Sequence, residues 1–331
     1  MNCKKYINLL FSGTSDFIKY ASVTVVSALE NLEENVGINV YFLYADILKP
    51  ISDITRNDWI EQISYSFKDK NVNFNFINVI DKLNLLKNLN IGLWGREVSL
   101  THYIHYLAPL VMTDVDKVIH IDCDFIVNCN LCEIFDIDLG EKLIVLAAQN
   151  GVEEDIENHN GGFSILNLKQ WRKENTFSDI INFGENLPKS KFCDTYLINE
   201  YFRKKHPDRL LVIDKTYNLF PLSHPDLKIE EIKNLHFTGP NLKPWLDLWC
   251  ICRGSFLWWQ YARKTTFYES FIFDNMLNLR YQSENYIQKR INEIEKRINE
   301  YINKFSIKYL FVTRPVHTLL AIQLALFDEL N

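Results

Sequence analysis

Two aspartates stand one residue apart at the end of an apolar stretch. Asp122 and Asp124 lie in VIHIDCDFIV, residues 118–127. In an extended strand the side chains of residues i and i+2 point to the same face, which would bring both carboxylates to one place. Two carboxylates this close repel, and the pKa of one rises unless a cation neutralises the pair. Carboxylate oxygens suit Mg²⁺ or Mn²⁺ and an added imidazole favours Mn²⁺, so we expect a divalent metal site.

A second segment with suitable chemistry is LHFTGPNLKPW, residues 235–245. Its imidazole, His236, is able to complete a metal site, and Lys243 is able to meet a phosphate as a point charge. Gly239 and Pro240 form a turn signal, and a glycine lets the backbone come close to a ligand. The alternative for this segment is a surface loop with a tryptophan packed in the core.

The elements that must position these residues alternate along the chain. Apolar and β-branched stretches predict strands at residues 6–12, 38–44, 72–79 and 117–121, and helical spacing predicts helices at 20–32, 55–67 and 99–112. This alternation favours an α/β fold, with a mixed, mostly parallel sheet and helices on both faces. Ligands of such sheets bind beyond the carboxyl ends of the strands. That rule points to residues 11–17 and 122–124.

The composition changes after about residue 248. We therefore expect a main domain, 1–248, and a C-terminal helical tail, 249–331, rich in aromatic and basic residues. Within the tail, residues 285–305 carry apolar side chains spaced alternately four and three apart, which is typical of a helix that pairs with a partner. Three interpretations stay open: a homodimer through 285–305, peripheral contact with an anionic membrane surface, or packing on the main domain. Pro315 interrupts the pattern, and a final apolar helix is expected after it.

The overall composition excludes several classes of protein. In 331 residues, 47% are hydrophobic and 24% charged, which excludes wholesale disorder, and the net charge of −6 argues against a nucleic-acid partner. The aromatic content of 14% is higher than ordinary. The longest apolar stretch near the C-terminus, 318–327, is about half the ~18 residues of a spanning helix, and the N-terminus lacks a secretory signal. We expect a cytoplasmic protein with reduced thiols, at most peripheral on the inner membrane.

Taken together, four elements resemble glycosyltransferase family 8, the retaining nucleotide-sugar transferases with the GT-A, Rossmann-like fold. They are the D-x-D of Asp122 and Asp124, NGGFSILNLKQWR at 160–172, CDTYLIN at 193–199, and the H-x-x-G…KPW loop at 236–245. The resemblance runs from residue 6 to about 245. It is closest in character to the bacterial lipopolysaccharide galactosyl- and glucosyltransferases.

The resemblance implies roles for individual residues. Asp122, Asp124 and His236 would hold Mn²⁺, with Mg²⁺ as the other candidate, and Lys243 with the backbone near Gly239 would hold the diphosphate of a UDP-sugar. Further donor-site positions are Ser12, Gly13, Thr14 and Phe17 for the uridine, together with His105, Asp122 and Cys123. Asn160 and Asp194 would bind sugar hydroxyls, and Thr195 would face the anomeric carbon, where the family usually has Gln.

The expected activity is transfer of a hexose, galactose or glucose, from a UDP-sugar to a bacterial surface glycan or glycolipid. The acceptor would serve lipopolysaccharide or capsule synthesis. Retention by same-face attack is favoured, because Asp194 is the one evident nucleophile and the resemblance gives it to sugar binding. A metal-dependent nucleotidyltransferase is an alternative, although FSGTSDF lacks the expected basic, Gly-rich loop. A catalytically silent glycan-binding or scaffold protein is another, which Thr195 keeps open.

Overall fold

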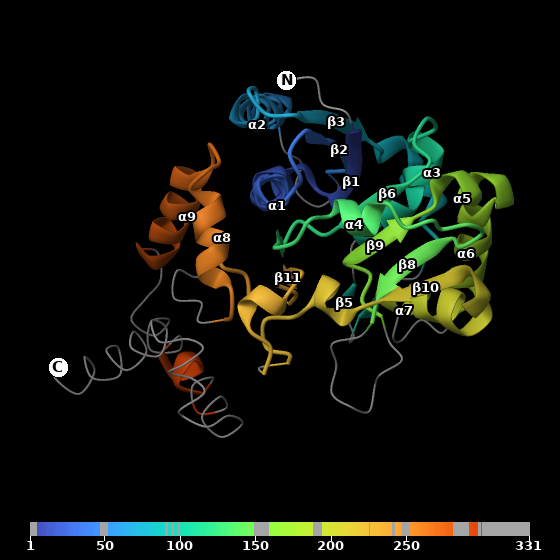
Figure 1. Cartoon of the computed structure of the whole chain (residues 1–331). Coiled ribbons are helices and arrows are strands. Elements are labelled where there is room, and N and C mark those ends of the chain that lie inside the picture. Colours follow the sequence, from blue (N-terminus) through green and yellow to red (C-terminus); the bar gives the residue numbers. More distant parts are fainter. Residues whose placement is uncertain are drawn as a thin grey trace.

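The computed structural model describes residues 5–46, 52–89, 92–93, 96–97, 100–148, 159–187, 194–224, 226–239, 242–246, 252–280, 291–296 and 299. Its centre is a seven-stranded sheet of order β10-β8-β9-β6-β1-β2-β3 (Figure 1). The strands are β1 (Lys5–Gly13), β2 (Val36–Tyr44), β3 (Val72–Asn78), β6 (Val118–Ile121), β8 (Ile144–Ala147), β9 (Phe163–Leu166) and β10 (Leu210–Ile213).

The strands of this sheet are mostly parallel. β1 pairs in parallel with β2 and β6, β2 with β3, and β8 with β10, whereas β9 runs antiparallel to both β6 and β8. The carboxyl ends of β1, β2 and β6 therefore lie along one edge of the sheet. Two small antiparallel sheets add to it, β7 (Phe125–Val127) with β11 (Asn234–His236), and β4 (Gly92–Leu93) with β5 (Arg96–Glu97).

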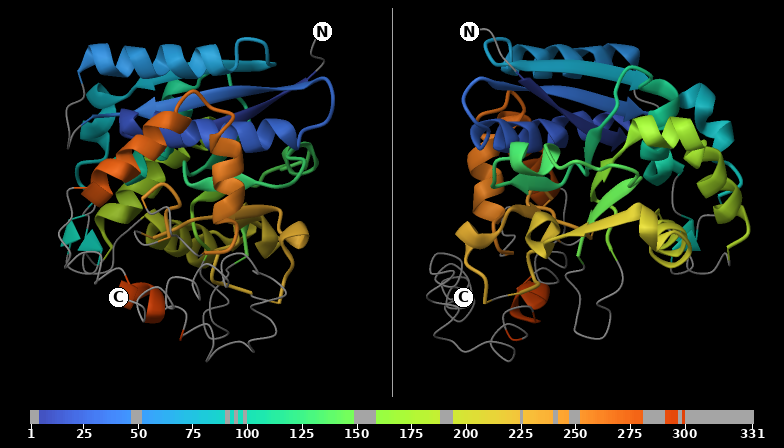
Figure 2. Two further views of the ribbon diagram at one scale, coloured as in Figure 1. Left: turned by 90° about the vertical axis from the view of Figure 1, so that its left-hand side faces the viewer. Right: turned by 45° about the vertical axis from the view of Figure 1, so that its right-hand side comes forward.

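Helices cover both faces of the sheet, as Figure 2 shows. The α-helices are α1 (Ile18–Glu30), α2 (Asp53–Ser66), α3 (Ala108–Val111), α4 (Cys132–Phe135), α5 (Leu168–Glu174), α6 (Thr176–Glu185), α7 (Asp194–Ile198), α8 (Ser255–Ala262) and α9 (Tyr268–Arg280). Shorter 3-10 turns include η1 (Ser15–Phe17), η3 (Leu100–Leu107) and η8 (Lys215–Asn218), and a π-helical segment, η6 (Asn199–Lys205), follows α7.

The core lies in two layers, one on each face. Along β1 the side chains alternate, so that Ile7, Leu9 and Phe11 pack in the layer with α1, while Leu10 packs in the layer with η3. The first layer also contains side chains of α8 and α9, and the second contains those of α5, α6 and α7. This arrangement confirms the predicted α/β fold with a mixed, mostly parallel sheet.

The boundaries of the predicted strands and of the first two predicted helices agree with the structure to within two residues. The predicted helix at 99–112 is different, because it forms a 3-10 helix, η3, followed by the single α-helical turn α3. Pro109 lies in the first turn of α3 and has no N–H to donate to the carbonyl four residues earlier, which favours the start of a new helix over a continuous one.

The helices α8 and α9 of the C-terminal region pack against α1, on one face of the sheet. In Figures 1 and 2, α8 and α9 lie beside α1, and Trp258, Phe267 and Phe271 are buried in the same core layer as α1. Of the predicted seam at 285–305, residues 291–296 are helical, while most of it and the final apolar helix lie outside the described residues. Within the described ranges, no helix combines the length and the apolar character that crossing a bilayer requires.

Candidate metal and donor site

Asp122 and Asp124 lie at the carboxyl edge of the sheet, in the turn between β6 and β7. The strand ends at Ile121, so the expectation that both carboxylates share a face of an extended strand is wrong in its geometry. The turn still brings them together, because Asp122 N–H donates to the carbonyl of Gly162 at 2.9 Å and the carbonyl of Asp124 accepts from Phe237 N–H at 2.9 Å. Both backbones are thereby tied to neighbouring segments.

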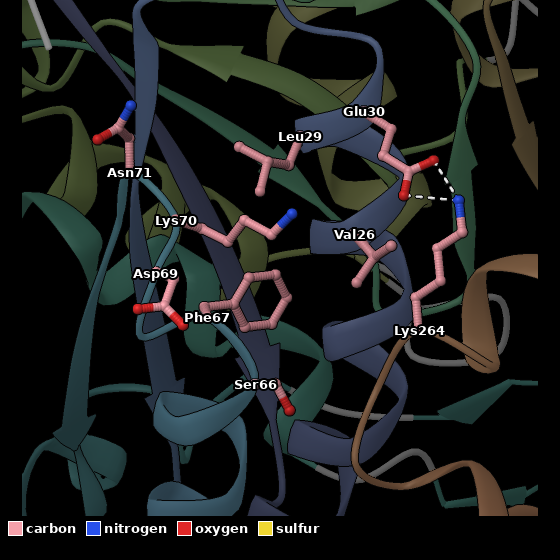
Figure 3. A pocket seen from close by; sticks show the side chains of 9 residues that line it. All are labelled: Val26, Leu29, Glu30, Ser66, Phe67, Asp69, Lys70, Asn71 and Lys264. Atoms are coloured by element: carbon pink, nitrogen blue, oxygen red, sulfur yellow. Dashed lines mark hydrogen bonds and ion pairs between the residues drawn. The ribbon is translucent and has the colours of Figure 1, made fainter. Parts of the chain in front are cut away.

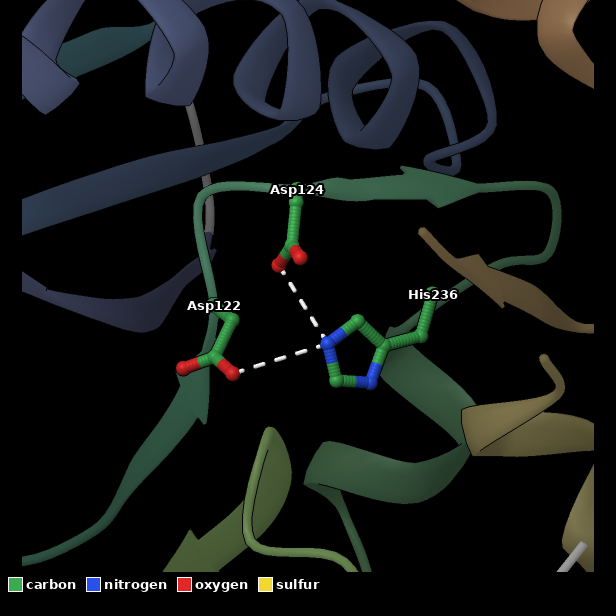
Figure 4. Close-up of side chains that lie close together, drawn as sticks. All are labelled: Asp122, Asp124 and His236. Atoms are coloured by element: carbon green, nitrogen blue, oxygen red, sulfur yellow. Dashed lines mark ion pairs between the residues drawn. The ribbon is translucent and has the colours of Figure 1, made fainter. Parts of the chain in front are cut away.

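His236 reaches the two aspartates through the small β7–β11 sheet. In that antiparallel pair His236 lies opposite Phe125, directly beside Asp124. The imidazole Nε2 is 3.3 Å from a carboxylate oxygen of Asp124 and 3.6 Å from one of Asp122, as Figure 4 shows. One possible ligand atom from each of the three side chains lies within 4.8 Å of the other two. Two carboxylates and an imidazole facing one point fit a divalent cation.

The other nitrogen of His236 is held by Asn218, at the end of η8. His236 Nδ1 lies 2.9 Å from Asn218 Oδ1, while Asn218 Nδ2 donates to the carbonyl of Asn160 at 3.1 Å. Because a carbonyl only accepts, the amide orientation of Asn218 is defined, and the hydrogen of the imidazole belongs on Nδ1. Nε2 is then the nitrogen that faces the carboxylates. Such outer contacts are what orient histidine ligands of metals.

The two carboxyl groups have opposite pKa shifts. The pKa of Asp122 is raised, chiefly because its carboxyl lies deep among protein atoms and then because of the charge of Asp124, although 44% of its side-chain surface stays accessible. Burial also opposes the charge of Asp124, but His236 and Lys243 together outweigh it and lower the pKa. Lys243 forms an ion pair with Asp124. The two carboxyl groups differ because Lys243 pairs with Asp124 and not with Asp122.

Glycine at position 162 makes room for this cluster. A Cβ atom there would lie 2.5 Å from His236 Cε1 and 2.6 Å from an oxygen of Asp122. Neither group can withdraw without leaving the cluster, so a side chain at this position is excluded. The second glycine of the NGG sequence is therefore explained by the packing of the site.

The residues expected to bind the sugar gather beside this glycine. Asn160 Oδ1 accepts from Gly162 N–H at 2.9 Å, and the Thr195 hydroxyl accepts from Gly161 N–H at 3.3 Å. Asp194 opens α7, and its pKa is raised by burial, against which His102 acts. The structure thus brings Asn160, Asp194 and Thr195 to one side of the metal cluster.

The loop after β1 is held by an acidic residue that follows β2. Asp46 accepts from Ser15 N–H at 2.7 Å and from the Ser15 hydroxyl at 2.9 Å, and it pairs with Arg56 at 2.8 Å. Ser12 and Gly13 end β1, and Thr14 precedes η1, which contains Phe17. Phe17 is 37% exposed, and its ring meets Tyr20 edge-on at 5.7 Å. This leaves an accessible aromatic ring at the carboxyl edge of the sheet.

Two other expected donor-site residues lie in the interior. His105 is buried and stacks on His120 with ring centroids 4.3 Å apart, and burial is the main cause of its lowered pKa. Cys123 is buried between the aspartates, and its carbonyl accepts from the Thr24 hydroxyl at 3.3 Å. Gly239 takes a left-handed conformation, φ 84°, that favours glycine, in the segment after β11.

Several contacts that shape the site have no clear signal in the sequence. Asn218 lies in TYNLF and Asp46 in YAD, segments without a recognisable motif. Asn199 ends the CDTYLIN segment, and its side chain bonds both the N–H and the carbonyl of His159, at 2.8 and 2.7 Å. A polar residue that closes a short apolar helix is the one signal that could have pointed to Asn199.

A separate cavity of about 520 Å³ lies near the C-terminal end of α1 (Figure 3). Phe67, Lys70 and Asn71 line it from the turn before β3, and Glu30 and Lys264 form an ion pair at its rim. Because β3 begins here, the cavity is at the amino edge of the parallel strands. It is therefore distinct from the metal cluster at the carboxyl edge.

This chain is similar in sequence to known proteins. The model of the family described as Glycosyl transferase family 8 matches residues 8–249. Glycosyltransferase GlyB of Streptococcus pneumoniae is 22% identical over 225 residues, which are 63% of this chain and 53% of that protein. A putative glycosyltransferase of Haemophilus influenzae is 24% identical over 257 residues, 71% of this chain and 72% of that protein. The chain therefore spans about half the length of GlyB.

Solved structures agree with the fold. The galactosyltransferase LgtC, solved in complex with donor and acceptor sugar analogs, superimposes with a TM-score of 0.57 at 18% identity, over 78% of this chain and 96% of that chain. The apo form of GlyE from Streptococcus pneumoniae gives a TM-score of 0.57 at 20% identity, over 78% of this chain and 60% of that chain. These likenesses confirm the GT-A architecture, and the family match covers most of the sequence. The chain belongs to glycosyl transferase family 8.

Proposed function

We propose that this protein transfers a hexose, galactose or glucose, from a UDP-sugar to a bacterial surface glycan or its lipid-linked precursor. The observation that carries the proposal is the convergence of Asp122, Asp124 and His236 beside Lys243. LgtC, which shares the fold, is named a galactosyltransferase and was solved with donor and acceptor sugar analogs, which supports the same class of reaction.

Asp122, Asp124 and the Nε2 atom of His236 are the residues that would hold the metal, with Mn²⁺ preferred because of the imidazole. A divalent metal at this position supplies Lewis-acid stabilisation of the charge that develops on the leaving diphosphate. Asn218 keeps the imidazole oriented for this task through Nδ1. Gly162 keeps the space beside the cluster free of side-chain atoms.

Lys243 adds a second positive charge on the leaving-group side. Its ammonium pairs with Asp124, which places it beside the metal cluster, and the backbone around Gly239 follows β11 at the same edge. We assign both to the diphosphate, because a fixed cation and backbone donors stabilise charge where it builds up. The loop from Ser12 to Phe17 then takes the uridine, with the exposed ring of Phe17 against the base.

On the sugar side, Asn160 and Asp194 bind hydroxyl groups and Thr195 faces the anomeric carbon. Bond cleavage gives the sugar an oxocarbenium-like character, as in glycoside hydrolysis. The acceptor hydroxyl attacks from the face that the UDP leaves, and the departing phosphate oxygen takes its proton. We assign Asp194 to hydroxyl binding because it is held in place. It begins α7, and its backbone carbonyl accepts a hydrogen bond from the Tyr106 hydroxyl at 3.3 Å.

The test measures products with several UDP-sugars and Mn²⁺, with and without a chelator, and with simple glycosides as acceptors. UDP release that stops on chelation, with a retained anomeric linkage in the product, is the expected result. In a parallel reaction with UTP and a sugar 1-phosphate, release of pyrophosphate would identify a nucleotidyltransferase instead. Absence of both, together with sugar binding by calorimetry, would identify a silent glycan-binding protein.

A further inference from the structure

The segment that carries Lys243, residues 242–246, is held by a part of the chain beyond the family match. That match ends at residue 249, whereas α9 covers Tyr268–Arg280. Asn275, in α9, is 3% exposed, and its Nδ2 donates to the carbonyl of Trp245 at 2.7 Å and to that of Phe271 at 2.9 Å. A buried side-chain amide is thus used to link α9 to the Lys243 segment.

A second polar contact lies on the other side of the lysine. The thiol of Cys252 donates to the carbonyl of Leu242 across 3.6 Å. Leu242 and Trp245 flank Lys243, and both of their carbonyls are bonded from residues after 249. Within the segment, Leu246 N–H donates to the carbonyl of Lys243 at 3.2 Å. The backbone around the lysine is therefore fixed at three points.

Stacked aromatic rings strengthen the same connection. Tyr20 of α1 stacks on Trp245 at 4.4 Å and on Phe271 of α9 at 5.6 Å. Trp258 of α8 packs against Trp245 at 5.3 Å, and the Lys243 ammonium lies 5.5 Å from the Trp245 ring. Aromatic pairs of this geometry attract one another beyond the effect of the area they bury.

The α8–α9 pair is itself held against α1 and the end of α2 by polar contacts. Lys264 pairs with Glu30 at the end of α1, Lys19 with Asp274 at 3.4 Å, and the Thr266 hydroxyl bonds the Ser66 hydroxyl at 2.9 Å. The pair therefore offers the Lys243 segment a support that is braced by α1 and α2.

From these contacts we infer that α8 and α9 are part of the donor site, with Asn275 as the positioning residue that holds Lys243 toward the diphosphate. This inference rests on the proposed function, which assigns Lys243 to the leaving group. A lysine has a flexible stem and gains from a backbone that is already fixed, because less conformational entropy is then lost on binding. The many aromatic residues after residue 248 therefore support the site by packing behind the Lys243 segment.

The first test reads the support directly and needs no nucleotide. Hydrogen exchange is measured in the full chain for Asn275→Leu, which keeps the volume and removes both donors. Exchange in the peptide containing 242–246 is expected to become about 3- to 10-fold faster, the effect of one lost hydrogen bond, with the 118–127 peptide unchanged. Unchanged exchange at 242–246, or equal acceleration in both peptides, would overturn the inference.

The second test measures the affinity for UDP with Mn²⁺ by calorimetry in a double-mutant cycle. Lys243→Ala is expected to weaken UDP binding by about 10- to 100-fold, as for a lost charged hydrogen bond, and Asn275→Leu by about 3- to 10-fold. In the Lys243→Ala background, Asn275→Leu should add nothing. Equal loss in both backgrounds would show a general structural role and overturn the inference, as would no loss in the native background.

Asn186→Leu is the matched control. It removes an exposed side-chain amide that donates to the carbonyl of Asn182 at the end of α6, outside the α8–α9 pair, and UDP affinity should stay the same. If Lys243→Ala leaves UDP affinity unchanged, the diphosphate role in the proposed function fails, and the exchange experiment still decides whether Asn275 holds the segment. The two failures are therefore distinguishable.

Discussion

On the metal side of the site, charged groups meet from parts of the chain more than a hundred residues apart. On the proposed sugar side, neutral hydrogen bonds join segments that are closer in the sequence. Lys243 and Asp124 are 119 positions apart, and His236 ends strand β11, whereas the aspartates lie in the turn between β6 and β7. On the sugar side, Thr195 bonds Gly161 and Asn199 bonds His159, at separations of 34 and 40 positions. Asn218 links the two sides through His236 and Asn160.

The difference concerns how much each side tolerates change. A buried charge that loses its partner is costly, so any substitution in the metal cluster disturbs the remaining charges. A neutral hydrogen bond contributes only about 0.5–1.5 kcal/mol, so the sugar side is able to vary. We therefore expect diphosphate binding to depend strictly on the cluster, and sugar preference to depend on Thr195 and its neighbours.

The largest effect is expected for Asp124→Asn. It removes a carboxylate that faces His236 and pairs with Lys243, and Mn²⁺ binding by calorimetry should be lost. Sugar transfer should fall about 1,000-fold or more, because a bound metal supplies several kcal/mol of charge stabilisation. Asp136→Asn is the control, since this aspartate is exposed and pairs with Lys5 outside the site. Native Mn²⁺ affinity in Asp124→Asn would remove the basis of the metal assignment.

An intermediate effect is expected for Asn218→Ala. Loss of the contact to His236 Nδ1 leaves the imidazole free to turn, and outer contacts of this kind typically change metal affinity by about 10- to 100-fold. The measurement is Mn²⁺ affinity without nucleotide.

The substitution Asn218→Asp tests the contribution of Asn218 to the metal side separately from its contribution to the sugar side. The carboxylate still accepts from His236 Nδ1 but no longer donates to the carbonyl of Asn160. Metal affinity should stay nearer to the native value than in Asn218→Ala, while the preference among UDP-sugars changes. Equal loss of metal affinity in both variants would mean that the bond to Asn160 also supports the metal side.

The smallest effect is expected for Thr195→Val, which keeps the shape and removes the hydroxyl that accepts from Gly161 N–H. The turnover number should fall by up to about 10-fold, as expected for one neutral hydrogen bond, with Mn²⁺ affinity within about 2-fold. Thr195→Ser should restore turnover. A parallel fall in metal affinity would show that the two sides are not independent.

Much of the fold and part of the site were predictable from local sequence. The apolar strands and the first two helices follow from periodicity, and the D-x-D and H-x-x-G…KPW segments pointed to the residues that converge. Asn218, Asp46 and Asn275 could not be found in this way. Each is a single polar residue without a motif, and its importance comes from a partner many positions away.

The sequence by itself determined the order of strands and helices and the residue types available for chemistry, because alternation of apolar residues depends on neighbours along the chain. Only the tertiary structure decided which atoms meet. The chain turns after Ile121, where an extended strand was expected, and this turn brings Asp122 and Asp124 together. The register of β7 with β11 places His236 beside them. Likewise, α9 packs against α1 and becomes the support of Lys243. Burial and strand register act between distant segments, and they choose the partner of each polar group, since a buried polar atom must find one.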